Sequence, residues 1–369
     1  MHARKQILGL EYLRGIAALL VVIFHMKPFW DYWLPGASTF VNGGSYLGVG
    51  AFFVLSGFVM GVATESGDSA LSFLAARLVR VYIPGVVATS LFLWVTSDGR
   101  GWLAAFNMMP PGGYQPYYGY GVYAVCWTLA YEILFYLIYS FAIFLSYKNR
   151  TLIAACLLAL LVFPVRFLSV GKFGLGVDQG VNYDATSDIW YGIFAMSTNP
   201  IMLLFLAGLL MYQNRTALLL LAQPSAFSYA CLALGAIYVA LSYLYVTGHG
   251  LTNMGVGSVF LTTFFLVISS LITRPGLFGR LFWVLEKYSF SLYLMHFVAI
   301  EARYFYLPFL IDAMPFEVTR RWHTVFVMTA IGLTTWLFFQ ACDQPAQRLS
   351  RIVRQSIRHF EDFRRLKRI

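Results

Sequence analysis

Arg14 and His25 place a cation and an imidazole at the two ends of an apolar stretch near the start of the chain. The apolar run between them, residues 15–24, would extend about 15 Å as a helix, whereas the hydrocarbon core of a bilayer is about 30 Å thick. A membrane helix here must therefore include Arg14, His25 or both. They are eleven residues apart, close to three turns, so both lie on one helix face. Ionisable groups inside a membrane helix indicate a functional site, although the same spacing also suits a helix whose ends reach the two headgroup layers.

Five further side chains are candidates for catalysis or substrate binding at the same site. Glu132 is the acid of a second apolar run, where an embedded carboxylate requires a basic partner. Tyr136 follows one turn later on the same face. Ser289, Tyr293 and His296 have the spacing i, i+4, i+7, which places them in one polar stripe that points into a helix bundle. Tyr136, Tyr293 and His296 are the candidate donors to an oxyanion, with Ser289 as a further candidate for substrate contact.

Arg77 and Arg80 are three residues apart and therefore share a helix face. Two planar guanidinium groups side by side suit the recognition of phosphate. The alternative is that they only orient the chain in the membrane by their positive charge.

Several enzyme and transporter classes are disfavoured by missing motifs. The chain has no Walker A motif, no Gly-x-Ser-x-Gly, no His-Glu-x-x-His and no dinucleotide fingerprint in a suitable context. Its four cysteines lack the spacing of metal ligands. We therefore expect neither ATP-driven transport nor serine or zinc hydrolysis, and no metal cofactor.

The composition predicts the element that must position these residues, a bundle of membrane helices. Hydrophobic residues make up 59% of the 369 residues, charged residues only 11%, and the mean hydropathy is +0.69. We predict an all-α polytopic membrane protein of about ten spans with no soluble domain. The predicted spans are 8–29, 46–64, 79–96, 123–146, 151–168, 191–211, 227–246, 255–272, 289–307 and 323–341. Pro345 is expected to end the last helix, so that residues 1–345 form the transmembrane domain and 346–369 a basic tail.

The distribution of positive charge predicts the orientation. An even number of spans places both termini on one side, and the excess of Lys and Arg on that side places it in the cytoplasm. Much of the net charge of +10 lies in the tail, which would face anionic lipid, so it does not indicate binding to nucleic acid.

Six motifs, in order along the chain, resemble the acyltransferase family 3 of integral membrane acyltransferases, bacterial proteins that modify surface glycans. They are residues 10–18 (LEYLRGIAA) through His25, 52–58 (FFVLSGF), 77–80 (RLVR), 127–136 (WTLAYEILFY), 289–296 (SFSLYLMH) and 343–345 (DQP). The fourth motif resembles the branch linked to exopolysaccharide. Gly50 stands where many members carry an acid, and Ile133 and Leu134 replace an acid and an amide found in other branches.

The resemblance implies an O-acyltransferase of the bacterial inner membrane. Such proteins transfer an acyl group, usually acetyl, from cytoplasmic acetyl-CoA to a hydroxyl of a glycan or glycolipid. His25 would be catalytic, and Arg14, Arg77 and Arg80 would bind the phosphates of the donor. In our hypothesis His25 takes a proton from the acceptor hydroxyl, which attacks the thioester. Glu132 would orient His25 or pair with Arg14. A covalent acetyl-histidine relay is the second mechanism.

Two other functions explain the same spans and embedded charges. One is a transporter or flippase for a glycolipid or polysaccharide, and the other is a structural subunit of a polysaccharide-synthesis complex. The acceptor, the acyl group and the oligomeric state are left open by the sequence.

Overall fold

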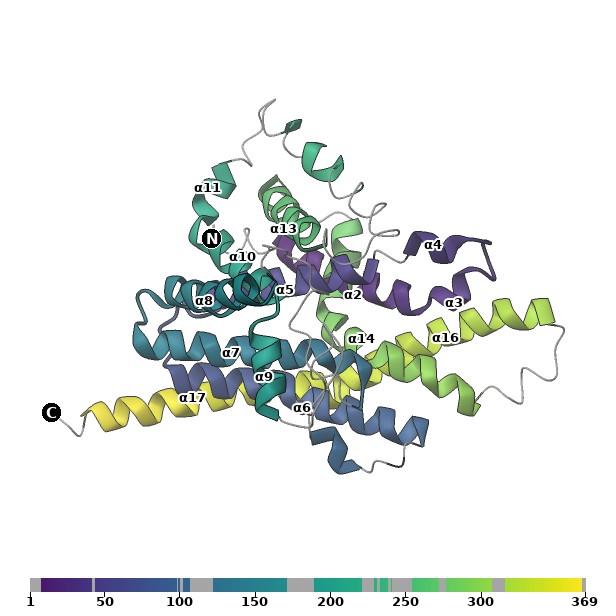
Figure 1. Cartoon of the computed structure of the whole chain (residues 1–369). Coiled ribbons are helices and arrows are strands. Elements are labelled where there is room, and N and C mark those ends of the chain that lie inside the picture. Colours follow the sequence, from purple (N-terminus) through teal and green to yellow (C-terminus); the bar gives the residue numbers. More distant parts are fainter. Residues whose placement is uncertain are drawn as a thin grey trace. The chain divides into compact units, whose positions relative to one another are not determined.

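The structure is a computed structural model in which every regular element of the described residues is a helix (Figure 1). The residues described are 8–41, 44–97, 99, 102–106, 122–170, 189–220, 229–230, 233–237, 240, 254–271, 277–306 and 316–366. They divide into two compact units, of which the first comprises residues 1–55, 94–98 and 214–337 and the second comprises 56–93, 99–213 and 338–369. Each unit is therefore built from segments that lie far apart in the sequence.

The first unit is centred on the packing of α2 against α14. A Cβ atom on Gly15 would lie 2.9 Å from the backbone nitrogen of Glu286, so glycine is what allows the two helices to come this close. A Cβ atom on Gly48 would lie 2.6 Å from the carbonyl oxygen of Ala17, so α5 also approaches α2 closely. The helices of this unit are α2 (Leu8–His25), α3 (Lys27–Trp30), α4 (Ala37–Val41), the first part of α5 (Gly44–Ala63), α11 (Arg215–Leu220), α13 (Met254–Leu271), α14 (Leu277–Tyr306) and α16 (Phe316–Phe338).

The second unit also contains a close contact between helices at a glycine. A Cβ atom on Gly57 would overlap the carbonyl oxygen of Phe205, so glycine allows the end of α5 to pack closely against α10. The rings of Phe135 and Phe205 stack 4.3 Å apart beside this contact. The helices of this unit are most of α6 (Ala70–Thr96), η1 (Trp102–Phe106), η2 (Ala124–Cys126), α7 (Trp127–Leu145), α8 (Arg150–Val170), α9 (Ile189–Ser197), α10 (Met202–Gln213), η4 (Phe339–Asp343) and α17 (Gln344–Leu366).

Four helical segments of the described residues are long and apolar enough to cross a membrane. They are Tyr46–Ala63, Ala70–Thr96, Ala124–Leu145 and Arg321–Arg364, and a fifth results if Trp190–Ser197 and Met202–Gln213, bent by 48°, form one broken span. The helical positions agree with the sequence at several predicted segments, for example 46–64 with α5 and 151–168 with α8. The segment 227–246 lies largely outside the described residues. The total of about ten spans and the lack of a soluble domain stay predictions.

Pro345 does not end a helix, so this prediction was wrong. It lies in the first turn of α17, directly after the π-helical turn η4. In a regular α-helix the proline ring would clash with the carbonyl of Ala341, and a π-helical turn is a common way to relieve such a conflict. Residues 346–366 consequently continue as a helix with a polar, basic face.

Candidate functional site

The two imidazole rings of His25 and His296 meet within the first unit. His25 is the last residue of α2 and His296 lies in α14. His296 Nε2 lies 3.2 Å from His25 Nδ1, and the ring centroids are 4.9 Å apart. His296 is fully buried. The structure thus joins two of the residues that the sequence singled out separately.

The hydrogen bonds around the two rings select their tautomers. His296 Nδ1 lies 3.1 Å from the carbonyl oxygen of Leu292, and His25 Nδ1 lies 2.9 Å from that of Val21. Because a carbonyl oxygen only accepts, both Nδ1 atoms carry the hydrogen when the rings are neutral. His296 Nε2 is then an acceptor, which shares the Nδ1–H of His25 with Val21. The lone pair of His25 Nε2 is left to take up a proton.

Aromatic rings surround the histidine pair. The rings of Phe24 and Phe297 lie 5.1 Å and 5.4 Å from that of His25, and the ring of Tyr293 lies 6.1 Å from that of His296. Ser289 lies two turns before His296 on the same face of α14. It is buried, and its hydroxyl has no hydrogen-bond partner among the described residues. This arrangement provides one basic nitrogen within an apolar wall, which suits general base chemistry.

The acid that faces Arg14 is Glu286, at 3.9 Å, on the same two helices as the histidine pair. Glu286 is not among the site residues predicted from the sequence. The sequence does contain a signal for Glu286, because its position extends the polar stripe of α14 by one turn. The stripe then consists of Glu286, Ser289, Tyr293 and His296, which recur at helical intervals on one face.

Glu132 belongs to the second unit and accepts two hydrogen bonds there. Ser56 Oγ donates to Glu132 Oε1 at 3.3 Å, and the hydroxyl of Tyr136 donates to the same oxygen. These contacts hold the carboxylate on the face shared with Tyr136, as the one-turn spacing predicted. The pairing of Glu132 with His25 or Arg14 stays a prediction, since those residues belong to the other unit.

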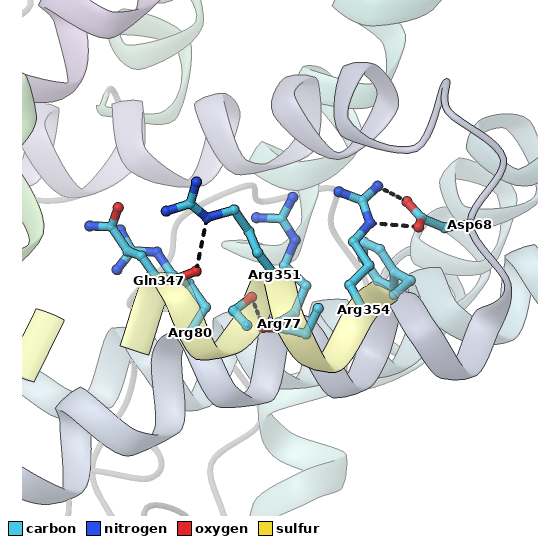
Figure 2. Close-up of a pocket in the computed structure, with 9 residues that line it drawn as sticks. Asp68, Arg77, Arg80, Gln347, Arg351 and Arg354 are labelled. Atoms are coloured by element: carbon cyan, nitrogen blue, oxygen red, sulfur yellow. Dashed lines mark hydrogen bonds and ion pairs between the residues drawn. The ribbon is translucent and has the colours of Figure 1, made fainter. Parts of the chain in front are cut away.

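Arg77 and Arg80 line a pocket in the second unit with a cavity volume of about 240 Å³ (Figure 2). Arg80 pairs with Asp343, whose side chain is 1% exposed and also accepts from Gln347 Nε2 at 3.1 Å. Arg77 lies over the rings of Phe73 and Tyr136, at 5.8 Å and 5.9 Å. The full lining is Asp68, Phe73, Ala76, Arg77, Arg80, Gln347, Ser350, Arg351 and Arg354.

Four of the nine lining residues come from α17, which was predicted from the sequence only as a basic tail. Arg354 Nε donates to Asp68 Oδ1 at 2.6 Å, and Arg358 pairs with the same carboxylate. No sequence signal links Asp68 to α17, because the two are separated by most of the chain and meet only through the fold.

Comparison with known proteins adds one finding to this geometry. The model of acyltransferase family 3, described as an acyltransferase domain, matches residues 7–340, which include the histidine pair, Glu132, Arg77 and Arg80. No curated protein and no solved structure matches the chain. Because the family match covers most of the 369 residues and the structure carries apolar helices long enough to span a membrane, the chain belongs to the acyltransferase family 3 and is a membrane acyltransferase.

Proposed function

We propose that this acyltransferase moves an acetyl group from cytoplasmic acetyl-CoA to a hydroxyl of an exported glycan, as a member of the exopolysaccharide branch. In this proposal the protein lies in the bacterial inner membrane, crosses it about ten times and has both termini in the cytoplasm. The observation that carries the proposal is the pairing of His25 with His296, because it leaves a single basic nitrogen, His25 Nε2, within an apolar wall.

The proposed reaction is a direct transfer. His25 Nε2 takes the proton of the acceptor hydroxyl while the hydroxyl oxygen attacks the thioester carbon. The tetrahedral intermediate then collapses, the C–S bond breaks, and the proton passes from His25 to the leaving thiolate. The transient imidazolium keeps its Nδ1–H on Val21 and His296, so no hydrogen bond has to be remade.

The geometry favours a positioning role for His296 over the oxyanion role. Both of its nitrogens are engaged, since Nδ1 donates to Leu292 and Nε2 accepts from His25. Tyr136 already donates its hydroxyl to Glu132. Of the three candidate oxyanion donors we propose Tyr293, because it lies on the same helix as His296 and its ring is 6.1 Å from that of His296.

The donor is proposed to bind through Arg77, with Arg80 and Arg14 in supporting roles. Arg77 faces the pocket of the second unit without a carboxylate partner among the described residues. Arg80 and Arg14 each face an acid, Asp343 and Glu286. This difference supports Arg77 as the direct phosphate ligand and Arg80 as a residue that shapes its pocket. Binding of the donor by Arg14 stays a proposal.

The test is transfer of label from radioactive acetyl-CoA to glycan by the purified protein. We expect label in the carbohydrate fraction. Uptake of glycolipid into vesicles without labelled product would instead favour the transporter alternative. The initial rate is also measured as a function of acetyl-CoA at several fixed acceptor concentrations. Intersecting lines in the double-reciprocal plot support direct transfer, and parallel lines support the acetyl-histidine relay.

A further inference from the structure

Helix α17 supplies part of the basic pocket and is fixed against the second unit by several contacts. Ser350 Oγ donates to the carbonyl oxygen of Ala76 at 2.7 Å, which holds α17 alongside α6. One turn further, Arg354 Nη2 donates to the carbonyl oxygen of Ala63 at 2.9 Å. The helix begins at Gln344, beyond residue 340, where the match to the family ends. Its pocket residues are therefore features of this chain outside the matched domain.

The acids at the pocket are already neutralised by other arginines. Asp68 is shared by Arg354 and Arg358, and Asp343 is bound by Arg80. Among the described residues, Arg77 and Arg351 have no carboxylate partner. Two positive charges thus face the cavity uncompensated.

The guanidinium groups of Arg77 and Arg351 line the same cavity. Arg77 is kept in place by the rings of Phe73 and Tyr136. Arg351 Nε donates to the carbonyl oxygen of Gln347 at 3.4 Å, so its remaining N–H groups can bind an anion. Figure 2 shows Arg351 and Arg354 reaching away from α17 on one side, with Arg77 between them. The cavity of about 240 Å³ exceeds the roughly 30 Å³ share of one water several times over, which leaves room for a phosphate group.

We propose that Arg351 and Arg77 together bind a phosphate ester and that α17 thereby completes the donor site. Planar guanidinium forks match phosphate oxygens in pairs, and two of them suit a doubly charged group. That the phosphate belongs to the nucleotide end of acetyl-CoA rests on the proposed function. A phosphate of a lipid headgroup has the same chemistry and is the other source.

The first test measures binding without turnover. The full-length protein in zwitterionic nanodiscs is titrated with adenosine 3′,5′-bisphosphate by calorimetry. We expect Arg351→Ala to weaken binding about tenfold or more. Arg348→Ala, which removes the same charge one turn earlier on α17 but outside the pocket, is expected to leave the affinity within about twofold. Equal loss in both variants, or no loss in either, would overturn the site. A wild-type protein that binds but does not transfer label would contradict only the proposed function.

The second test separates the two sources of phosphate. With acetyl-CoA, we expect Arg351→Ala to raise KM about tenfold and to leave kcat within about twofold. For the wild type, we expect the KM for acetyl-dephospho-CoA to be about tenfold higher than the KM for acetyl-CoA. For Arg351→Ala, we expect the KM values for the two donors to be nearly equal. If KM is unchanged but Arg351→Ala abolishes stimulation by phosphatidic acid in the nanodisc, the phosphate is that of a lipid and the donor assignment is wrong.

Discussion

At the scale of single residues, the histidine pair concentrates the chemistry. His25 and His296 are 271 positions apart, and each makes one hydrogen bond to the helix that carries it and one to the other ring. The lone pair of His25 Nε2 is therefore fixed by its surroundings, in the way that a hydrogen-bonded partner fixes the tautomer of a catalytic histidine elsewhere.

Removal of His296 should lower the rate but leave donor binding intact. His296→Ala removes an acceptor of the His25 Nδ1–H, so we expect kcat to fall about 10- to 100-fold with little change in KM for acetyl-CoA. His296→Gln should restore part of the rate, because its amide oxygen can accept in place of Nε2. Steady-state kinetics of the three proteins measure this. An unchanged kcat in His296→Ala would remove His296 from the mechanism.

Arg80 and Asp343 should be more important for stability than for binding the donor. Arg80→Ala leaves the carboxylate of Asp343, which is 1% exposed, without its ion-pair partner. We expect destabilisation of about 3 kcal/mol. The double variant Arg80→Ala with Asp343→Asn should be more stable than the single one, since it leaves no buried charge. Thermal unfolding in detergent tests this order, and the reverse order would contradict it.

At the scale of elements, glycine sets the distance between helices. Gly15 on α2 meets the backbone of Glu286, whereas a Cβ atom on Gly332 of α16 would meet nothing within 4 Å. Gly15→Ala must push α14 away from α2 and should cost about 1–3 kcal/mol, together with activity, because the same helices carry the histidine pair.

Gly332→Ala is the matched control for this prediction. In an open helix position, alanine should stabilise by up to about 1 kcal/mol. Thermal unfolding and label transfer of both variants are the measurements. An equal response of the two positions would show that helix propensity, and not the contact between α2 and α14, determines the effect.

The sequence predicted the helices better than their contacts. Apolar run length placed α5 and α8 correctly because it depends on local composition alone. The spacing of Ser289, Tyr293 and His296 predicted an inward face of α14 for the same reason, and Ser289 and His296 are buried. The contact of His296 with His25 required the packing of α2 on α14, which no local pattern encodes. The prediction that the last helix ends at Pro345 was wrong, because the local rule for proline does not allow for a π-helical turn before it.

At the scale of the whole molecule, each unit carries a different part of the proposed machinery. The first unit holds the candidate base, His25. The second unit holds the candidate donor site, and it also holds Glu132, which lies on α7. The family match extends across segments of both units. Each unit also draws on segments from both halves of the chain, so neither half of the sequence contains one unit alone.

The central claim is that His25 is the base of an acyl transfer, and one comparison tests it most directly. Transfer from radioactive acetyl-CoA to glycan is measured for the wild type, His25→Ala and His323→Ala, with calorimetric donor affinity measured on the same samples. His323 lies in the same unit, where its ring packs 5.4 Å from that of Phe29, and serves as the matched histidine control. We predict that His25→Ala binds donor normally and transfers at least about 1,000-fold more slowly, while His323→Ala transfers at close to the wild-type rate. Turnover of His25→Ala at close to the wild-type rate would contradict the account.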